Sequence, residues 1–178
     1  MKYTDYYKYL NESLDDPYKV KWNFTYDQIE VEDDEGDHYF KYLFTPTQII
    51  KFTTDEGIEY LWYARQSYHN DSFWTIAFGT YQGKDDRGTH KLDINLTKNT
   101  KNPLRVFATV VDIINRFIEL DEEQSIQYLQ FESEGDKRTK LYLKRLLPRI
   151  DHFAVDHIET HKTMDNVDKS TVTLKRVS

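Results

Sequence analysis

The chain has 178 residues, a formal net charge of −7, 15% aromatic residues and no cysteine. A chain of this length usually forms one domain, or one domain with a short appendage. The absence of cysteine excludes disulfide bonds, thiolate metal sites and a cysteine nucleophile. No apolar stretch approaches the length of a membrane span, so we expect no membrane partner.

The negative charge lies in the first half of the chain. Residues 1–100 contain 11 Lys and Arg against 18 Asp and Glu, whereas residues 101–178 contain 13 of each kind. An acidic chain is repelled by a nucleic-acid backbone, which is also negatively charged. We therefore do not expect a nucleic-acid partner, unless a local basic surface outweighs the total charge.

The first 14 residues are predicted to form a short amphipathic helix. Tyr6, Tyr9 and Leu10 fall on one helical face, and Asp15-Asp16-Pro17 ends the pattern. Little else in this segment would hold it to a core. We therefore predict a helical appendage over residues 1–16 and a single α+β domain over residues 17–178.

The next part of the chain is predicted to be a meander of antiparallel strands, because apolar and polar residues alternate with a period of two. Asp55-Glu56-Gly57 provides the turn of a hairpin. The acidic run 30–37 is predicted to be a solvated turn, since it lacks the ligand spacing of a calcium loop. The expected strands are residues 18–24, 38–44, 47–53, 58–65 and 73–81, followed by a loop over 82–88.

Residues 89–177 are predicted to form a strand–helix–strand–helix–hairpin unit. Asn102 and Pro103 are typical of a helix start, with Asn as the N-cap and Pro in the first turn. A strand, a helix and a second strand in this order predict a right-handed parallel crossover, and hence a mixed central sheet. The expected elements are strand 92–96, a helix from residue 103 to about 118, strand 126–132, helix 136–147 ended by Pro148, and strands 153–160 and 169–177.

This order of elements resembles the GNAT (N-acyltransferase) fold from its fourth strand onward. Residues 131–133 followed by residues 138–146 are similar to the closing motif of that fold, in which a strand and a turn lead to a helix bearing Leu-Tyr. In acetyltransferases that Tyr often protonates the leaving coenzyme A thiolate, and Tyr142 is the matching position. The other interpretation of Tyr142 is an amphipathic aromatic at the edge of the core.

The cofactor loop of the same family is matched less well. The family has a Gly-rich turn after its fourth strand, where backbone N–H groups and a helix N-terminus hold the cofactor pyrophosphate. The corresponding residues here contain no glycine, and Pro103 has no N–H to donate. The candidate cofactor-binding residues are Lys98, Asn99, Thr100, Lys101 and Asn102, and the alternative is an ordinary capped helix entry.

A closer resemblance links residues 107–114, Phe117, Ile118 and the later Leu-Tyr helix to a set of uncharacterised proteins of tailed phages and some bacteria. The match covers about residues 89–150. The start of the chain, residues 1–4 and 7–12, is also similar to the leaders that target internal head proteins into T-even-type capsids. A prohead protease of those systems cuts after Leu-x-Glu, which Leu10 and Glu12 match; the alternative is a docking helix.

Two further groups of residues are candidates for binding. Six positive charges lie on or beside one predicted helix, which indicates a phosphate-binding surface or, more often, a solvated helix face. They are Lys137, Arg138, Lys140, Lys144, Arg145 and Arg149. His157 and His161 lie four residues apart on a predicted strand, where this spacing separates them by about 13 Å, so we expect no metal site.

These resemblances, together with the absence of glycine from the candidate cofactor loop, imply a phage-encoded, non-catalytic protein that uses a GNAT-like scaffold to bind a protein partner, of the host or of the virion. Inhibition of a host defence factor is one such role. Its location would be the virion or the host cytoplasm, and it would need no cofactor. The first alternative is an N-acyltransferase that uses acetyl-CoA, with Tyr142 as the general acid. The second is a nucleic-acid-binding module, and the oligomeric state is left open.

Overall fold

The computed structural model describes residues 16–22, 25–31, 43–67, 69–84, 86, 90–93, 101–134, 136–162 and 168–177. The predicted N-terminal helix and the leader residues Leu10 and Glu12 lie outside the described residues, as does most of the expected strand 38–44. The same holds for Lys98, Asn99 and Thr100.

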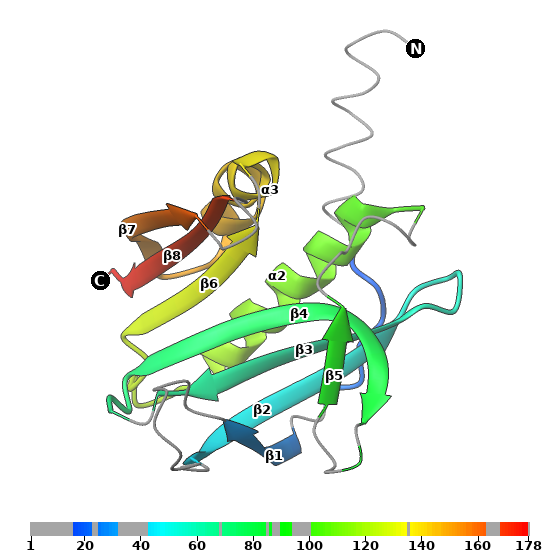
Figure 1. The fold of residues 1–178 in the computed structure, drawn as a ribbon, viewed down its shortest axis with the longest axis horizontal. Coiled ribbons are helices and arrows are strands. Elements are labelled where there is room, and N and C mark those ends of the chain that lie inside the picture. Colours follow the sequence, from blue (N-terminus) through cyan, green and yellow to red (C-terminus); the bar gives the residue numbers. More distant parts are fainter. Residues whose placement is uncertain are drawn as a thin grey trace, which may run out of the picture.

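The described residues form a mixed sheet and two helical segments, which confirms a mixed α+β architecture (Figure 1). The sheet has eight strands in the order β1-β2-β3-β4-β6-β8-β7, and β5 pairs with part of β4. The strands are β1 (Thr25–Val31), β2 (Leu43–Thr53), β3 (Glu59–Gln66), β4 (Phe73–Lys84), β5 (His90–Asp93), β6 (Tyr128–Glu134), β7 (Phe153–Lys162) and β8 (Asp168–Arg176). The helices are α2 (Pro103–Glu119) and α3 (Asp136–Leu141).

The predicted hairpin of the first half is confirmed. β2 and β3 pair antiparallel, and the turn between them places Gly57 at φ 81°, a conformation that favours glycine. β1, which pairs with β2, was not predicted. The expected strand 18–24 is wrong over its described residues, because only Val20 bridges to the sheet, at Phe52. The Tyr18 N–H instead donates to the Thr109 hydroxyl on α2 at 2.8 Å.

The parallel pair of strands differs from the prediction. β6 runs parallel to β4, with Phe73–Ile76 opposite Tyr128–Phe131, whereas the expected partner was strand 92–96. β4 continues to Lys84, beyond the expected strand end, and β5 folds back antiparallel against its last residues. The α2 crossover therefore joins β4 to β6, and β5 is an additional short strand within the connection.

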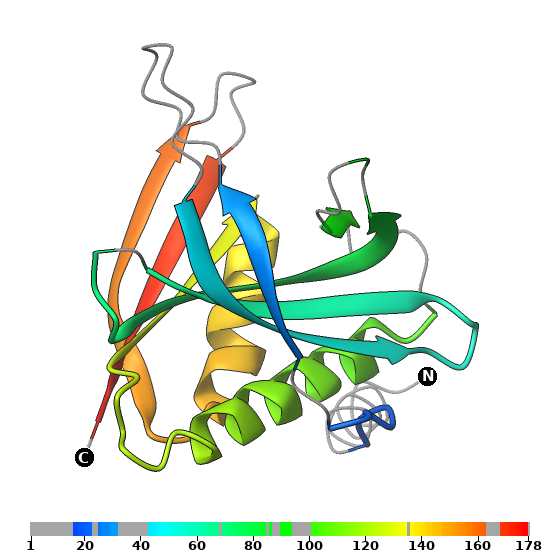
Figure 2. The ribbon, with the colours of Figure 1, turned by 90° about the horizontal axis from the view of Figure 1, so that it is seen from below.

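Helix α2 begins and packs as its sequence predicts. The Asn102 side chain accepts a hydrogen bond from the Arg105 N–H at 3.2 Å, and Pro103 occupies the first turn. The helix runs across the sheet (Figure 2), and ten of its residues are buried. Phe117 lies edge-on to Trp62 and Trp74 at ring-centroid distances of 5.5 and 5.2 Å. Full burial of each such side chain contributes about 1.5–3 kcal/mol, so this stripe anchors the helix.

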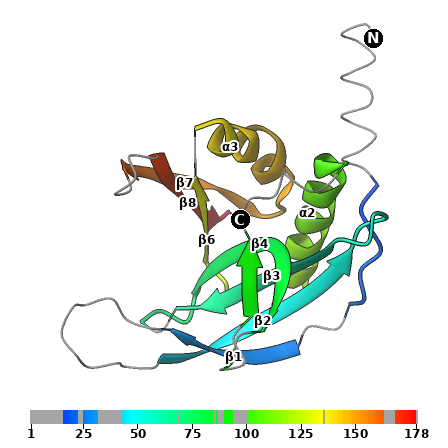
Figure 3. The same ribbon diagram turned by 45° about the vertical axis from the view of Figure 1, so that its right-hand side comes forward.

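The second helical segment is not one continuous α-helix as expected. α3 ends at Leu141, a π-helical turn covers Tyr142–Leu146, and a 3-10 turn covers Leu147–Arg149. Figure 3 shows the position of this segment, labelled α3, beside β6. Pro148 lies in the first turn of the 3-10 segment, where a residue without an N–H is tolerated. The segment leads into the predicted hairpin of β7 and β8, which is confirmed.

Candidate functional site

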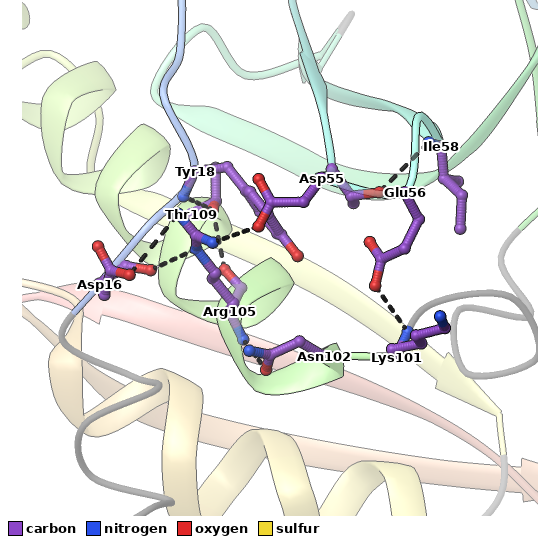
Figure 4. A network of polar contacts seen from close by, with 10 residues as sticks. Asp16, Tyr18, Asp55, Glu56, Ile58, Lys101, Asn102, Arg105 and Thr109 are labelled. Atoms are coloured by element: carbon purple, nitrogen blue, oxygen red, sulfur yellow. Dashed lines mark hydrogen bonds and ion pairs between the residues drawn. The ribbon is translucent and has the colours of Figure 1, made fainter.

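Around the N-terminus of α2, polar side chains from three segments converge (Figure 4). The segments are the connection at residues 16–18, the β2–β3 turn and the first turns of α2. We call this group the α2 N-terminal network; it comprises Asp16, Tyr18, Asp55, Glu56, Lys101, Asn102, Arg105 and Thr109. It includes Lys101 and Asn102, two of the five candidate cofactor-binding residues.

Two backbone donors at this helix end are already bonded to side chains of the chain. The Lys101 N–H donates to Oε1 of Glu56 at 3.3 Å, and the Arg105 N–H donates to Oδ1 of Asn102. The first helical residue, Pro103, has no N–H. A free phosphate-binding helix end would present these donors to the ligand. In this chain, the side chains of Glu56 and Asn102 accept two of these donors.

Arg105 joins the three segments of the network. Its Nη1 lies 2.7 Å from Oδ2 of Asp55, and its Nε donates to the backbone oxygen of Asp16 at 3.0 Å. The guanidinium also lies over the Tyr18 ring, 4.2 Å from the ring centroid. Planar guanidinium groups suit such combined stacking and forked bonding. Arg105 is therefore committed to structural contacts.

The network carries more negative than positive charge. Asp16, Asp55 and Glu56 contribute three carboxylates, against the cations of Arg105 and Lys101. The pKa of Glu56 is lowered, chiefly by a hydrogen bond with the Thr54 side chain, with a smaller contribution from the Lys101 N–H. Glu56 therefore remains ionised to a lower pH than an isolated glutamate. A carboxylate at this position repels a phosphate that approaches the helix end.

A cavity of about 210 Å³ lies elsewhere, where β4 and β6 separate. We call it the β4–β6 cavity. Side chains from β3, β4, β6, β8 and the π turn line it. They are Tyr63, Arg65, Thr75, Ile76, Ala77, Phe78, Phe131, Glu132, Ser133, Tyr142 and Lys169.

The cavity exists because the parallel pairing is short. The register between β4 and β6 ends at Ile76 and Phe131, and β5 pairs with β4 only from Thr80 onward. Among the described residues, no strand pairs with residues 77–79 of β4 or 132–134 of β6 along the edges that face each other. A gap of this kind at the carboxyl ends of parallel strands is a common place for a ligand.

Tyr142, the candidate proton donor, lines this cavity. Its side chain is 5% exposed, and its ring packs against Phe107 and Phe78 at centroid distances of 5.7 and 6.3 Å. It is the first residue of the π-helical turn, and such turns occur frequently at functional sites. The structure thus places Tyr142 at a cavity that neither Lys101 nor Asn102 lines.

The polar wall of the cavity was missed by the sequence analysis. Tyr63 and Arg65 lie two residues apart on β3, and Thr75 is directly opposite Arg65 on β4. Across the cavity, Nζ of Lys169 lies 2.7 Å from Oε2 of Glu132. Burial raises the pKa of Tyr63, so its phenol is neutral over the physiological range. These residues alternate with core positions, and no local motif distinguishes them.

A second hollow, of about 360 Å³, lies near the carboxyl end of α2. Its central charges are Arg176 and Asp121, whose side chains are 11% and 8% exposed and 2.8 Å apart. Burial favours protonation of Asp121, but hydrogen bonds from Ser125 and Ile126 and the charge of Arg176 outweigh it, so the pKa is lowered. These two groups hold the connection between α2 and β6 and are bonded to each other.

Four of the other candidate residues lie on the surface. Lys140 and Lys144 are exposed on the second helical segment, and His157 and His161 are exposed on β7. Among the described residues, no group of three or more His, Asp or Glu is placed to hold a metal ion. No helix in the described part of the chain is long and apolar enough to cross a membrane.

No protein-family model matches the sequence, and no curated protein matches it at a significant level. Among solved structures, the chain is similar to an acetyltransferase of Bacillus subtilis in complex with CoA, at 11% sequence identity and a TM-score of 0.37. The match covers 87% of this chain and 100% of that chain. A TM-score of this size does not establish a common fold.

Proposed function

We propose that this is a phage-encoded binding protein whose GNAT-like scaffold holds an extended segment of a partner protein in the β4–β6 cavity. The observation that carries the proposal is the Glu56 carboxylate, which accepts the Lys101 N–H at the end of α2. The resemblance to acyltransferases puts the cofactor phosphates near this place. In this chain the Glu56 carboxylate occupies that place, while the β4–β6 cavity remains open.

The edges of the cavity suit an extended chain. Residues 77–79 of β4 and 132–134 of β6 face each other without an intervening strand among the described residues. Backbone N–H and C=O groups along such edges pair readily with an added strand, and the side-chain pockets then select the sequence. A volume of about 210 Å³ is below the range of about 300–1,000 Å³ typical of drug-sized ligands, which favours a short segment.

The phage part of the proposal rests on the two sequence resemblances, to the uncharacterised tailed-phage proteins and to the capsid-targeting leaders. It places the protein in the virion or in the host cytoplasm, with a virion or host protein as partner. Mass spectrometry of purified particles tests the packaged form. We expect a chain that starts after Glu12, and detection of uncut protein there would contradict cleavage of the leader.

A second candidate function is acyl transfer, which the position of Tyr142 at the cavity favours. In this reaction an amine of the acceptor attacks the thioester carbonyl, and the sulfur–carbon bond breaks. Tyr142 would then donate its phenolic proton to the departing coenzyme A thiolate, and the phenolate would take up the proton that the attacking nitrogen loses. Nucleic-acid binding through Lys140, Lys144 and Arg145 is the weakest candidate, and salt-dependent retention on heparin, lost on reversal of Lys144 and Arg145, tests it.

Two experiments distinguish peptide binding from acyl transfer. We expect no calorimetric signal with acetyl-CoA at millimolar concentration, and we expect selection of peptides from a random display library. Ala77→Trp, which fills the cavity, should abolish peptide retention. Ala154→Trp, at an exposed position of β7, is the matched control and should retain it.

The opposite pattern would move the assignment to the second candidate. Acetyl-CoA binding, with a turnover that Tyr142→Phe lowers more than it weakens binding, would identify an acyltransferase. Peptides that bind equally to the wild type and to Ala77→Trp would show that the cavity is not the binding site.

A further inference from the structure

One wall of the β4–β6 cavity carries three polar side chains, those of Tyr63, Arg65 and Thr75. In the described part of the chain, no hydrogen bond or ion pair is formed by the side chains of Tyr63, Arg65 or Thr75. All three are partly buried and line the cavity. A partly buried guanidinium is normally bonded to a carboxylate or a carbonyl, because desolvation without a partner is costly.

The three side chains lie close enough to contact the same functional group of a ligand. Arg65 and Thr75 are direct cross-strand neighbours, whose Cβ atoms are about 5 Å apart in such a pair. Tyr63 is two residues from Arg65 on the same strand and so points to the same face. A guanidinium flanked by two hydroxyl groups is a set of donors that an anion can bridge.

The charge of the cavity has the sign that such a ligand requires. Its ionised lining residues are Arg65, Lys169 and Glu132, and the last two neutralise each other at 2.7 Å. One unpaired positive charge therefore remains in a chain whose net charge is −7. The phenol of Tyr63 adds a neutral donor, because burial keeps its pKa above the usual value.

We propose that the cavity binds the carboxyl terminus of an extended peptide, whose terminal carboxylate lies on Arg65, Tyr63 and Thr75. This inference rests on the proposed function and specifies which part of the partner enters. A carboxylate matches the forked geometry of the guanidinium with two parallel hydrogen bonds. The residues that precede it pair with residues 77–79 of β4, which begin two positions after Thr75 along the same strand.

The inference is tested with two pools of N-acetylated random tetrapeptides, one with free carboxylates and one with C-terminal amides. Each pool is passed over the immobilised full chain, and retained peptides are measured by mass spectrometry. We expect the free acids to bind at least about tenfold more tightly than the same sequences as amides, the difference that one charge-assisted contact confers. Arg65→Gln should remove this preference, and Arg65→Lys should restore part of it.

Lys91→Gln is the matched control, because Lys91 is an exposed cation of β5 that does not line the cavity. The preference for free acids should survive this change. Equal binding of acids and amides to the wild type would overturn the carboxylate inference and leave the peptide site standing. Failure of both pools to bind would overturn the proposed function itself. A preference that Arg65→Gln does not reduce would place the carboxylate elsewhere.

Discussion

The N-terminus of α2 and the β4–β6 cavity both lie where a ligand is expected, yet they differ in how the chain treats its own polar groups. At α2, Arg105, Lys101 and Asn102 are bonded to other parts of the chain. In the cavity, the side chains of Tyr63, Arg65 and Thr75 form no hydrogen bond or ion pair among the described residues. The polar groups at α2 therefore stabilise the fold, whereas those of the cavity wall remain available to a ligand.

The largest effect is expected in the α2 N-terminal network from Thr109→Val, an almost isosteric change. The Thr109 hydroxyl accepts the Tyr18 N–H at 2.8 Å in a buried setting, and valine leaves that donor unsatisfied. We expect a loss of about 1–3 kcal/mol in the free energy of unfolding, measured by urea denaturation. Thr109→Ser keeps the hydroxyl and is the control. A loss as large with serine would assign the effect to packing.

Two arginine substitutions compare the regions directly. Arg105→Ala removes an ion pair and a cation–π contact, so we expect it to lower the free energy of unfolding by about 1–2 kcal/mol. Arg65→Ala removes no partner, and its effect should stay within about 0.5 kcal/mol. Both are measured by urea denaturation. Equal losses would erase the distinction between a structural and a ligand-binding arginine.

A smaller effect is expected from pH at Glu56. Because the pKa of Glu56 is lowered in the folded chain, its ionised form stabilises the fold above the unfolded-state pKa. That contribution is lost as the pH falls through the lowered folded-state value. The stability difference between the wild type and Glu56→Gln should therefore be largest near neutral pH and disappear in acid. A difference that persists unchanged at low pH would exclude this carboxylate as its source.

Local patterns in the sequence predicted the parts of the fold that local forces determine. The apolar stripe of α2, its Asn102 cap and the β2–β3 hairpin each depend on residues a few positions apart, and each is confirmed. In the expected strand 18–24, apolar and polar residues alternate as regularly as in the other expected strands. The prediction fails because Tyr18 bonds to a residue 91 positions away. No local pattern contains that information.

The candidate site depends even more on distant residues. Tyr142 was identified through a resemblance, and the structure places it at the cavity. The wall of Tyr63, Arg65 and Thr75 arises only when β3 and β4 adopt their register, and the cavity arises only when β6 pairs with the first residues of β4. An arginine on a strand gives no signal of its own that it lacks a partner in the folded chain.

The short pairing between β4 and β6 also has a consequence for how the chain folds during synthesis. The hairpins of β1 to β4 join near neighbours in sequence, so they form early, and β4 is then an open sheet edge until β6 has been made. β5, which follows at once, pairs with the last residues of β4 and shortens that exposed edge. An open edge of this kind promotes aggregation. We therefore infer that β5 protects the nascent chain, which gives a role to the one strand that lies off the main path of the sheet.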